Sequence, residues 1–168
     1  MADGTDDEIS LTSRPPDEND LAALCRELHR RDAKFLVVGG FAVILLGYPR
    51  TTGDIDFLIE ASPENEKKVF DALATLSDEC VRELEAGDIA KYGVVRVADE
   101  IVVDLMAQAS GIDYEEAKQY IIVRDIDGVP VPCADTSLLL KMKQRSVREK
   151  DRADVYFLKN LPDAQKEA

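Results

Sequence analysis

Short apolar runs along the chain predict the strands of a buried sheet. Phe35–Val38 is wholly apolar, as expected of a strand that is covered on both faces. Two β-branched runs flank Ala98-Asp99-Glu100, and another pair flanks Asp127-Gly128, a dipeptide typical of hairpin turns. The predicted strands are Phe35–Val38, Asp54–Ile59, Tyr92–Val97, Ile101–Met106, Ile121–Ile126 and Val129–Cys133.

Other segments repeat their apolar residues every three or four positions and predict helices. Positions 21, 24, 25 and 28 share one helical face. Ser62-Pro63-Glu64 combines an N-cap, a proline at the first helical position and an acid in the first turn. The predicted helices are residues 17 to 31, Phe41–Leu46, a segment from Ser62, Cys80–Leu84, a segment from Asp113, a segment from Thr136, and Glu149–Leu158. Strands that alternate with helices, with hairpins added, predict an α/β (α+β) fold: a mixed β-sheet flanked by helices, with C-terminal helices.

The length of 168 residues predicts one domain that can bury a core without disulfides. Residues 1–16 are rich in acidic side chains and end in two prolines, so we expect a disordered acidic tail there. Residues 17–168 are expected to form a single domain, with a core at about 35–133 and a helical part at 135–160.

The net charge of −13 argues against a protein dedicated to nucleic-acid binding, because such a protein needs a basic surface. The segment from Lys141 to Arg152 is nevertheless basic and can face a polyphosphate. No apolar run approaches the roughly 18 residues of a membrane span, and the acidic N-terminal segment is unlike a signal peptide. We therefore expect a cytoplasmic protein without a membrane partner.

The cysteines and the one histidine narrow the chemistry further. Cys25, Cys80 and Cys133 lack metal-ligand spacing, so we expect three reduced thiols that pack as small buried hydrophobic residues. His29 lies on a predicted amphipathic helix, where we expect it to be exposed or at the flank. A multi-histidine metal site is thus excluded, and any triad or cysteine–histidine pair would depend on this one residue.

Three aspartates lie in segments that otherwise have the pattern of strands. Asp54 and Asp56 are two residues apart, so their side chains share one face of the predicted strand. Asp104 lies in an apolar run, where an unpaired carboxylate costs free energy. If the two strands are neighbours, the carboxylates converge on a site for Mg²⁺ or Mn²⁺. The alternative is that Asp54 and Asp56 only cap a strand and that Asp104 lies at a sheet edge.

Gly39 and Gly40 follow a predicted strand and precede a predicted helix. Such a turn lets backbone N–H groups approach a phosphate at a helix N-terminus, although it can equally be a plain strand-to-helix connection. Arg50, Thr51 and Thr52 precede the aspartate strand. Arg50 can grip a triphosphate and the hydroxyls can add hydrogen bonds, or the segment can be a solvated surface loop.

The basic segment near the C-terminal end offers further candidates. Lys141 and Lys143 can bind phosphates or line a solvated helix face. Asp151 and Asp154 are three residues apart on a predicted helix, so they can also be surface residues that pair with Lys150 or Arg148.

Together these motifs resemble the nucleotidyltransferase superfamily with the DNA polymerase β-like fold. The resemblance is carried by Val38-Gly39-Gly40, by Asp54-Ile55-Asp56 and by the later Asp104. It is closest to the small AbiEii-like nucleotidyltransferases, the toxins of type IV toxin–antitoxin systems, through the segment from Arg50 to Asp56 and through Lys150-Asp151-Arg152-Ala153-Asp154. Phe41 follows Gly40, whereas antitoxin-type enzymes usually carry Gly-Ser, so the resemblance does not point to the antitoxin branch.

The resemblance implies transfer of a nucleoside monophosphate from an NTP to a hydroxyl of RNA, protein or a small molecule. Asp54, Asp56 and Asp104 would be catalytic and would hold Mg²⁺ or Mn²⁺. The nucleotide would contact Gly39, Gly40, Arg50, Thr52 and Lys141, while Lys150, Asp151 and Asp154 would be accessory residues. An antitoxin or a second copy of the chain would be a partner. The alternative function is an inactive nucleotide-binding or protein-interaction module with the same fold.

Overall fold

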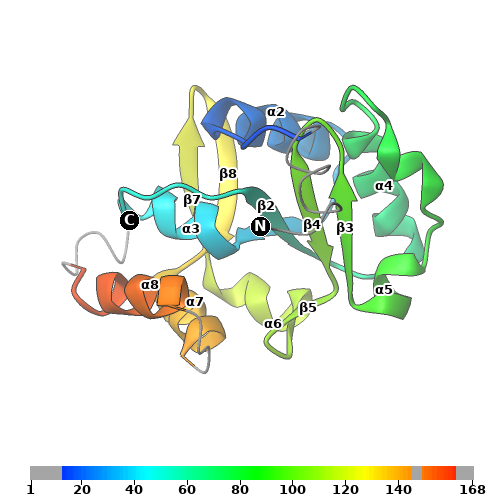
Figure 1. Ribbon diagram of the computed structural model, residues 1–168. Coiled ribbons are helices and arrows are strands. Elements are labelled where there is room, and N and C mark those ends of the chain that lie inside the picture. Colours follow the sequence, from blue (N-terminus) through cyan, green and yellow to red (C-terminus); the bar gives the residue numbers. More distant parts are fainter. Residues whose placement is uncertain (1–12, 145–148, 162–168) are drawn as a thin grey trace, which may run out of the picture.

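The computed structural model describes residues 13–144 and 149–161 and shows a six-stranded mixed sheet with helices around it (Figure 1). The order of strands is β3-β4-β2-β1-β8-β7. The strands are β1 (Phe35–Val38), β2 (Asp54–Ile59), β3 (Val94–Ala98), β4 (Val102–Met106), β7 (Ile121–Ile126) and β8 (Val129–Ala134), and a separate ribbon is formed by β5 (Gln108–Ala109) and β6 (Ile112–Asp113). This architecture confirms the predicted α/β (α+β) class.

Most of the helices are those that the sequence predicts. The α-helices are α2 (Glu18–Arg30), α3 (Gly39–Leu45), α4 (Pro63–Leu73), α5 (Asp88–Tyr92), α6 (Tyr114–Ala117), α7 (Thr136–Lys143) and α8 (Glu149–Lys159), and the 3₁₀ turns are η1 (Cys80–Glu83) and η2 (Lys118–Tyr120). Several boundaries differ from the prediction by one or two residues, and α5 is a helix that the sequence pattern does not predict. Helix α3 begins at the glycines themselves, and α5 takes up Tyr92, so the strand predicted from that residue begins at Val94.

The pairing of the central strands places the three aspartates near one another. Strand β2 pairs antiparallel with β1 on one side and parallel with β4 on the other. In this register Asp56 lies opposite Val38 of β1 and opposite Asp104 of β4. The turn into α3 begins directly after Val38, so the end of β1 and the start of α3 lie beside the aspartates of the inner strands β2 and β4.

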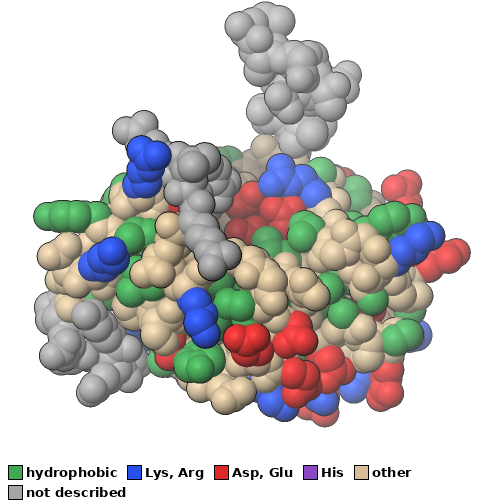
Figure 2. Space-filling view, turned by 90° about the horizontal axis from the view of Figure 1, so that it is seen from below, with side chains coloured by type: hydrophobic (Ala, Val, Ile, Leu, Met, Phe, Trp, Pro, Cys, Tyr) green, Lys and Arg blue, Asp and Glu red, His purple; other side chains and the backbone are tan. Residues whose placement is uncertain are grey.

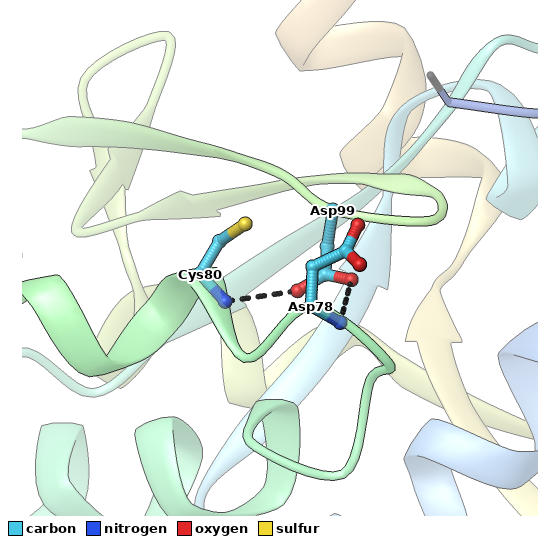
Figure 3. Close-up of side chains that lie close together, drawn as sticks. All are labelled: Asp78, Cys80 and Asp99. Carbon is cyan, nitrogen blue, oxygen red and sulfur yellow. Dashed lines mark hydrogen bonds between the residues drawn. The ribbon is translucent and has the colours of Figure 1, made fainter.

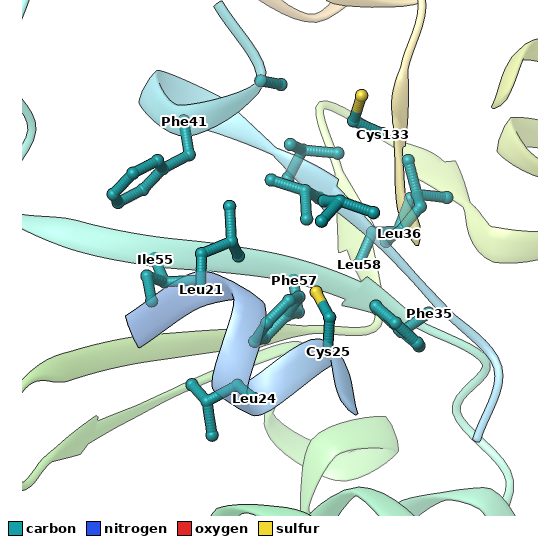
Figure 4. Packing of buried hydrophobic residues seen from close by; sticks show 14 of the residues in the cluster. Leu21, Leu24, Cys25, Phe35, Leu36, Phe41, Ile55, Phe57, Leu58 and Cys133 are labelled. Atoms are coloured by element: carbon teal, nitrogen blue, oxygen red, sulfur yellow. The ribbon is translucent and has the colours of Figure 1, made fainter. Parts of the chain in front are cut away.

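Helix α2 covers the central strands with its apolar face (Figure 4). A capping box between Asp17, the N-cap, and Asp20 begins the helix. Cys25 and Cys133 are free and buried, and burial raises the pKa of each thiol to about 12, which makes both unreactive. Cys80 is free but only half-buried, so the prediction of burial is wrong for this residue, because it lies in the η1 turn outside the sheet.

Two buried polar residues of α4 hold the loops around the sheet. The Asn65 side chain donates to the carbonyl groups of Lys34 and Glu60 and accepts from the Lys34 N–H. The Glu66 carboxylate is fully buried and accepts three backbone N–H groups of the segment Gly87–Ala90. Glu66 therefore fixes the start of α5, which leads into β3.

The C-terminal helices α7 and α8 pack against each other and close one end of the structure (Figure 1). Asp135 caps α7 by accepting the Leu138 N–H. Phe157 of α8 stacks on Tyr48, with ring centroids 4.7 Å apart and an interplanar angle of 12°. This contact joins α8 to the loop that leads from α3 to β2.

The segment before α2 lies along the turn between β3 and β4 and forms hydrogen bonds with it. The Ser13 hydroxyl donates to the Asp99 carbonyl and the Arg14 N–H donates to the Glu100 carbonyl. The predicted disordered tail falls mainly on residues 1–12, which lie outside the described residues. Within the described part of the chain, no helix has the length and the apolar character that a membrane crossing would require.

Candidate active site

The structure brings Asp54, Asp56 and Asp104 together. One carboxylate oxygen of each lies within 4.8 Å of the corresponding oxygens of the other two. The reason is the parallel pairing of β2 with β4, which sets Asp56 beside Asp104, while the alternation along β2 turns Asp54 to the same face. The alternative of separate caps and sheet-edge residues is therefore not what the fold shows.

Burial and the neighbouring carboxylates raise the pKa of Asp54 and of Asp56. Burial, followed by the negative charges of Asp54 and Asp104, raises the pKa of Asp56 to about 8. Burial and the charge of Asp104 also raise the pKa of Asp54. A nearby positive charge therefore stabilises the ionised form of these carboxylates, and one such charge comes from the protein itself.

Arg96 of β3 supplies this charge directly. Its Nε donates to Asp104 Oδ1 at 2.9 Å, and its Nη2 donates to Asp104 Oδ2 at 3.0 Å and to Asp54 Oδ2 at 2.9 Å. Arg96 lies directly opposite Asp104 in the antiparallel β3–β4 pair, which explains the two-pronged contact. Arg96 lies outside the sequence motifs that predict the site.

The two glycines are required by contacts on both sides of the turn. Gly39 has a φ of +69°, and a Cβ atom there would lie 2.0 Å from Asp56 Oδ2. A Cβ atom on Gly40 would lie 2.4 Å from Arg50 Nη1 and 2.6 Å from Thr52 Oγ1. Any larger residue would thus fill the space between the helix start, the aspartates and the arginine loop.

Arg50 is not a solvated surface residue, although the sequence leaves that alternative open. Its Nε lies 3.1 Å from Asp154 Oδ1, and its buried Nη1 has no hydrogen-bond partner among the described residues. The Thr52 hydroxyl, close to Arg50, makes a long hydrogen bond of 3.4 Å to the Asp54 carbonyl. Both side chains therefore keep donor capacity at the glycine turn.

Asp151 and Asp154 form a buried ionic network with Lys143. Lys143 Nζ lies 3.0 Å from Asp151 Oδ1 and 3.1 Å from Asp154 Oδ2. All three side chains are buried, so the alternative of surface pairing for these aspartates is wrong. The packing of α8 on α7 turns this face of α8 inward, which the spacing of three residues could not reveal.

The lysines of the C-terminal helices differ in their position. Lys141 is exposed, lies 3.8 Å from Glu116 Oε2 and sits over the Tyr120 ring. Lys143 and Lys150 line the cavity at the aspartates instead. Residues two apart on a helix point about 200° away from each other, so Lys141 and Lys143 cannot share one face. A contact of Lys141 with nucleotide stays a prediction.

A cavity of about 190 Å³ unites these groups. It is lined by Gly39, Gly40, Arg50, Thr52, Asp54, Asp56, Arg96, Asp104, Met106, Lys143, Lys150 and Asp151. The space-filling view shows a hollow in which acidic and basic side chains lie side by side (Figure 2). The acidic wall suits a cation, whereas the glycine turn and the basic side chains suit a polyphosphate.

A second acidic group, Asp78, Cys80 and Asp99, has a structural explanation (Figure 3). The Asp99 carboxylate accepts the N–H groups of Asp78 and Cys80 at 2.9 Å and that of Glu100 at 2.7 Å. Burial raises the pKa of Asp99, but these N–H donors outweigh burial and leave the pKa below its ordinary value. Asp99 thus clamps the β3–β4 turn to η1.

Comparisons with known proteins agree with this arrangement. Residues 17–166 match the family described as "Nucleotidyl transferase of unknown function (DUF2204)". A search of curated proteins gave no match.

Solved structures share the fold at low sequence identity. The lincomycin-bound lincosamide antibiotic adenylyltransferase LnuA is 15% identical with a TM-score of 0.56, and the alignment covers 89% of this chain and all of that one. An antigenic nucleotidyltransferase-like protein from Paracoccidioides brasiliensis is 19% identical with a TM-score of 0.52 over 86% of this chain and 78% of that one. The chain, which matches the family over most of its length, therefore belongs to this family of nucleotidyl transferases.

Proposed function

We propose that the protein transfers a nucleoside monophosphate from an NTP to a hydroxyl acceptor with the help of Mg²⁺ or Mn²⁺. The observation that carries this proposal is the convergence of Asp54, Asp56 and Asp104 within 4.8 Å, in the same cavity as the Gly39–Gly40 turn. The family of nucleotidyl transferases to which the chain belongs supports the same reaction type.

The donor set fits a hard divalent cation. Three carboxylates offer the oxygen ligands that Mg²⁺ and Mn²⁺ prefer. Their mutual repulsion, expressed in the raised pKa of Asp56, would be relieved by a cation. We assign Asp54, Asp56 and Asp104 as its ligands. When bound, the cation would neutralise charge that develops on the phosphate oxygens.

We assign the glycine turn and the basic side chains of the same cavity to the triphosphate. The N–H groups at the start of α3 and the absence of side chains at Gly39 and Gly40 let phosphate oxygens approach the backbone. Arg50 offers its unpartnered Nη1, Thr52 offers its hydroxyl, and Lys150 adds positive charge at the cavity wall. Asp151 and Asp154 act as accessory residues, because they hold Lys143 and Arg50 in place.

In the reaction the acceptor oxygen forms a bond to the α-phosphorus, and the bond to the bridging oxygen breaks so that pyrophosphate leaves. The acceptor proton passes to a carboxylate oxygen, and we assign Asp104 to this step. A cavity of about 270 Å³ has Asp56 in its lining, together with apolar side chains such as Met106, Leu139 and Met142 and polar ones such as Gln108 and Lys143. We assign the apolar side of this cavity to an uncharged part of a substrate, which can pack against these side chains.

The AbiEii-like resemblance adds a finer expectation, that the activity belongs to a toxin–antitoxin pair. It is supported by the position of Lys150 and Asp151 at the cavity wall, where a motif shared with those toxins would act. Growth arrest on expression, relieved by a genetically linked partner, would support it. Expression that leaves growth unchanged would remove it without affecting nucleotidyl transfer.

The reaction can be tested with labelled nucleotides. The protein is incubated with Mg²⁺, RNA or protein extract, and each NTP labelled in turn at the α- and the γ-phosphate. We expect transfer of the α-label alone, and loss of transfer in the Asp54→Ala/Asp56→Ala variant. Asp71→Ala removes an exposed aspartate of α4 and serves as the matched control.

The outcomes separate the alternatives. Transfer of the γ-label would show phosphoryl transfer and refute the proposed reaction. Transfer that persists in the double variant would refute the assignment of the aspartates. Nucleotide binding without any transfer would favour the inactive nucleotide-binding module with the same fold.

A further inference from the structure

We propose that Arg96 is an internal counterion of the carboxylate cluster, which competes with the divalent cation for Asp54 and Asp104. The inference rests on the proposed function only in so far as it takes these aspartates as cation ligands. It adds a residue outside the sequence motifs and gives it a role in setting the affinity for the cation.

The contacts of Arg96 show how closely it matches the cluster. Its guanidinium makes a two-pronged contact with Asp104 and a third hydrogen bond to Asp54, all between 2.9 and 3.0 Å. These carboxylates belong to the group of oxygens that lie within 4.8 Å of one another. One planar side chain thus bridges two of the three carboxylates, as a cation in the cluster would.

Competition follows from charge and from ligand geometry. A divalent cation close to Asp54 and Asp104 would lie only a few ångströms from the guanidinium, and like charges at such a distance repel. The oxygens that Arg96 holds would also have to turn toward the cation. Either the guanidinium moves away, or the cation binds more weakly than it would if the Arg96 guanidinium were absent.

Arg96 can move away because of its place in the fold. Strand β3 is one of the two edge strands of the described sheet, and the Arg96 side chain is 54% exposed, whereas that of Asp104 is 10% exposed. The arginine therefore lies over the carboxylates from the solvent side. Its displacement breaks hydrogen bonds but leaves the core of the sheet intact.

The competition also explains why three carboxylates can stay together without a cation. Arg96 contributes one positive charge that offsets part of their repulsion. Removal of the Arg96 guanidinium should lower the stability of the folded protein in the absence of divalent cations and should increase its affinity for such cations. A residue that merely positioned the ligands would have the opposite effect on binding.

The test measures binding of Mn²⁺ alone, without nucleotide or activity. The dissociation constant is determined for the wild type and for Arg96→Gln by the electron paramagnetic resonance signal of free Mn²⁺. We expect about tenfold tighter binding in the variant, which corresponds to about 1.4 kcal/mol. Arg82→Gln is the matched control, because Arg82 is an exposed arginine of η1 that pairs with Glu79.

Thermal melting in EDTA and in Mg²⁺ gives a second readout. Arg96→Gln should melt at a lower temperature than the wild type in EDTA, and Mg²⁺ should raise the melting temperature of the variant more than that of the wild type. If it does not fold, Arg96→Lys, which keeps the charge but cannot bridge both carboxylates, should still bind Mn²⁺ about two- to fivefold more tightly than the wild type.

Unchanged or weaker Mn²⁺ binding in the folded variant would overturn the proposal, and so would a lack of Mn²⁺ binding by both proteins. The outcome is independent of the transfer assay. A protein that shows the expected change in Mn²⁺ affinity but transfers no nucleotide would refute the proposed function and leave the role of Arg96 in place.

Discussion

Replacement of Gly39 by alanine tests the close approach of the glycine turn to the aspartates. The added Cβ atom would lie 2.0 Å from Asp56 Oδ2, 2.9 Å from its Cγ and 3.1 Å from its Cβ. Because the Cβ of Asp56 is itself close, rotation of the carboxylate cannot remove all of the conflict. To reach an ordinary contact of 3.4 Å, the Oδ2 atom must move by 3.4 − 2.0 = 1.4 Å.

Two costs add up in this variant. An alanine at the left-handed φ of +69° costs about 1–2 kcal/mol, and overpacking adds about 1–3 kcal/mol. We therefore expect the free energy of unfolding to fall by about 2–5 kcal/mol. A displacement of Asp56 by more than an ångström should also lower the transfer rate by about 100-fold.

Gly128→Ala is the matched control. Gly128 also has a left-handed φ, of +86°, but no atom lies within 4 Å of the position that an alanine Cβ would take there. Urea unfolding of both variants isolates the conflict with Asp56, because the φ cost and the entropy change of the unfolded chain are shared. Equal unfolding free energies, together with wild-type Mn²⁺ affinity in Gly39→Ala, would refute the reasoning.

Three further predictions concern buried charges. Asp154→Ala should lower the free energy of unfolding by about 3–5 kcal/mol in urea, because Arg50 loses its carboxylate partner and the buried Lys143 keeps Asp151 alone. A loss below about 1 kcal/mol, as expected for the exposed Asp71→Ala, would contradict this prediction. Glu66→Ala should lower the free energy of unfolding by at least about 3 kcal/mol, because three backbone N–H groups lose their acceptor. Glu64→Ala on the same helix should change this free energy little. A similar loss in both variants would show that Glu66 does not anchor the start of α5. The third prediction concerns the pKa of Asp56, which burial chiefly raises from 3.8 to about 8 in the folded protein. The folded state therefore binds the proton more tightly than the unfolded chain does. The resulting stabilisation is fully present below pH 3.8 and is lost as the pH rises to about 8. In EDTA, the unfolding free energy of the wild type should therefore fall relative to Asp56→Asn over this range, and a pH-independent difference would refute the shift.

The sequence predicted the strands and helices well where local signals are strong. The caps at Asp17, Ser62 and Asp135 mark helix starts, because each offers an oxygen to a backbone N–H of the first turn. The predicted strand begins too early, at Tyr92, because tyrosine is common in strands and the pattern does not show that α5, anchored by Glu66, includes Tyr92 and ends before Gly93.

The prediction that Asp54, Asp56 and Asp104 converge depended on one condition, the pairing of their strands. The spacing of two residues placed Asp54 and Asp56 on one face, but only the parallel pairing of β2 with β4 brought Asp104 to them. Arg96 could have been suspected as a lone arginine in a β-branched run. Nothing in the chain says, however, that the register of β3 and β4 sets it opposite Asp104.

Local patterns in the chain account for most of the elements and for the available chemistry: apolar runs that must be buried, a glycine pair that allows a close approach, and carboxylates with the hard oxygen ligands of a cation. Which charges meet depends on the packing of these elements. Strand order placed Arg96 over Asp54 and Asp104, and the packing of α8 on α7 put Asp151 and Asp154 around Lys143 while Lys141 stayed exposed. The physical reason is that hydrophobic burial and hydrogen bonding in a strand or a helix follow the local pattern, whereas electrostatic pairing depends on distances that only the packed chain sets.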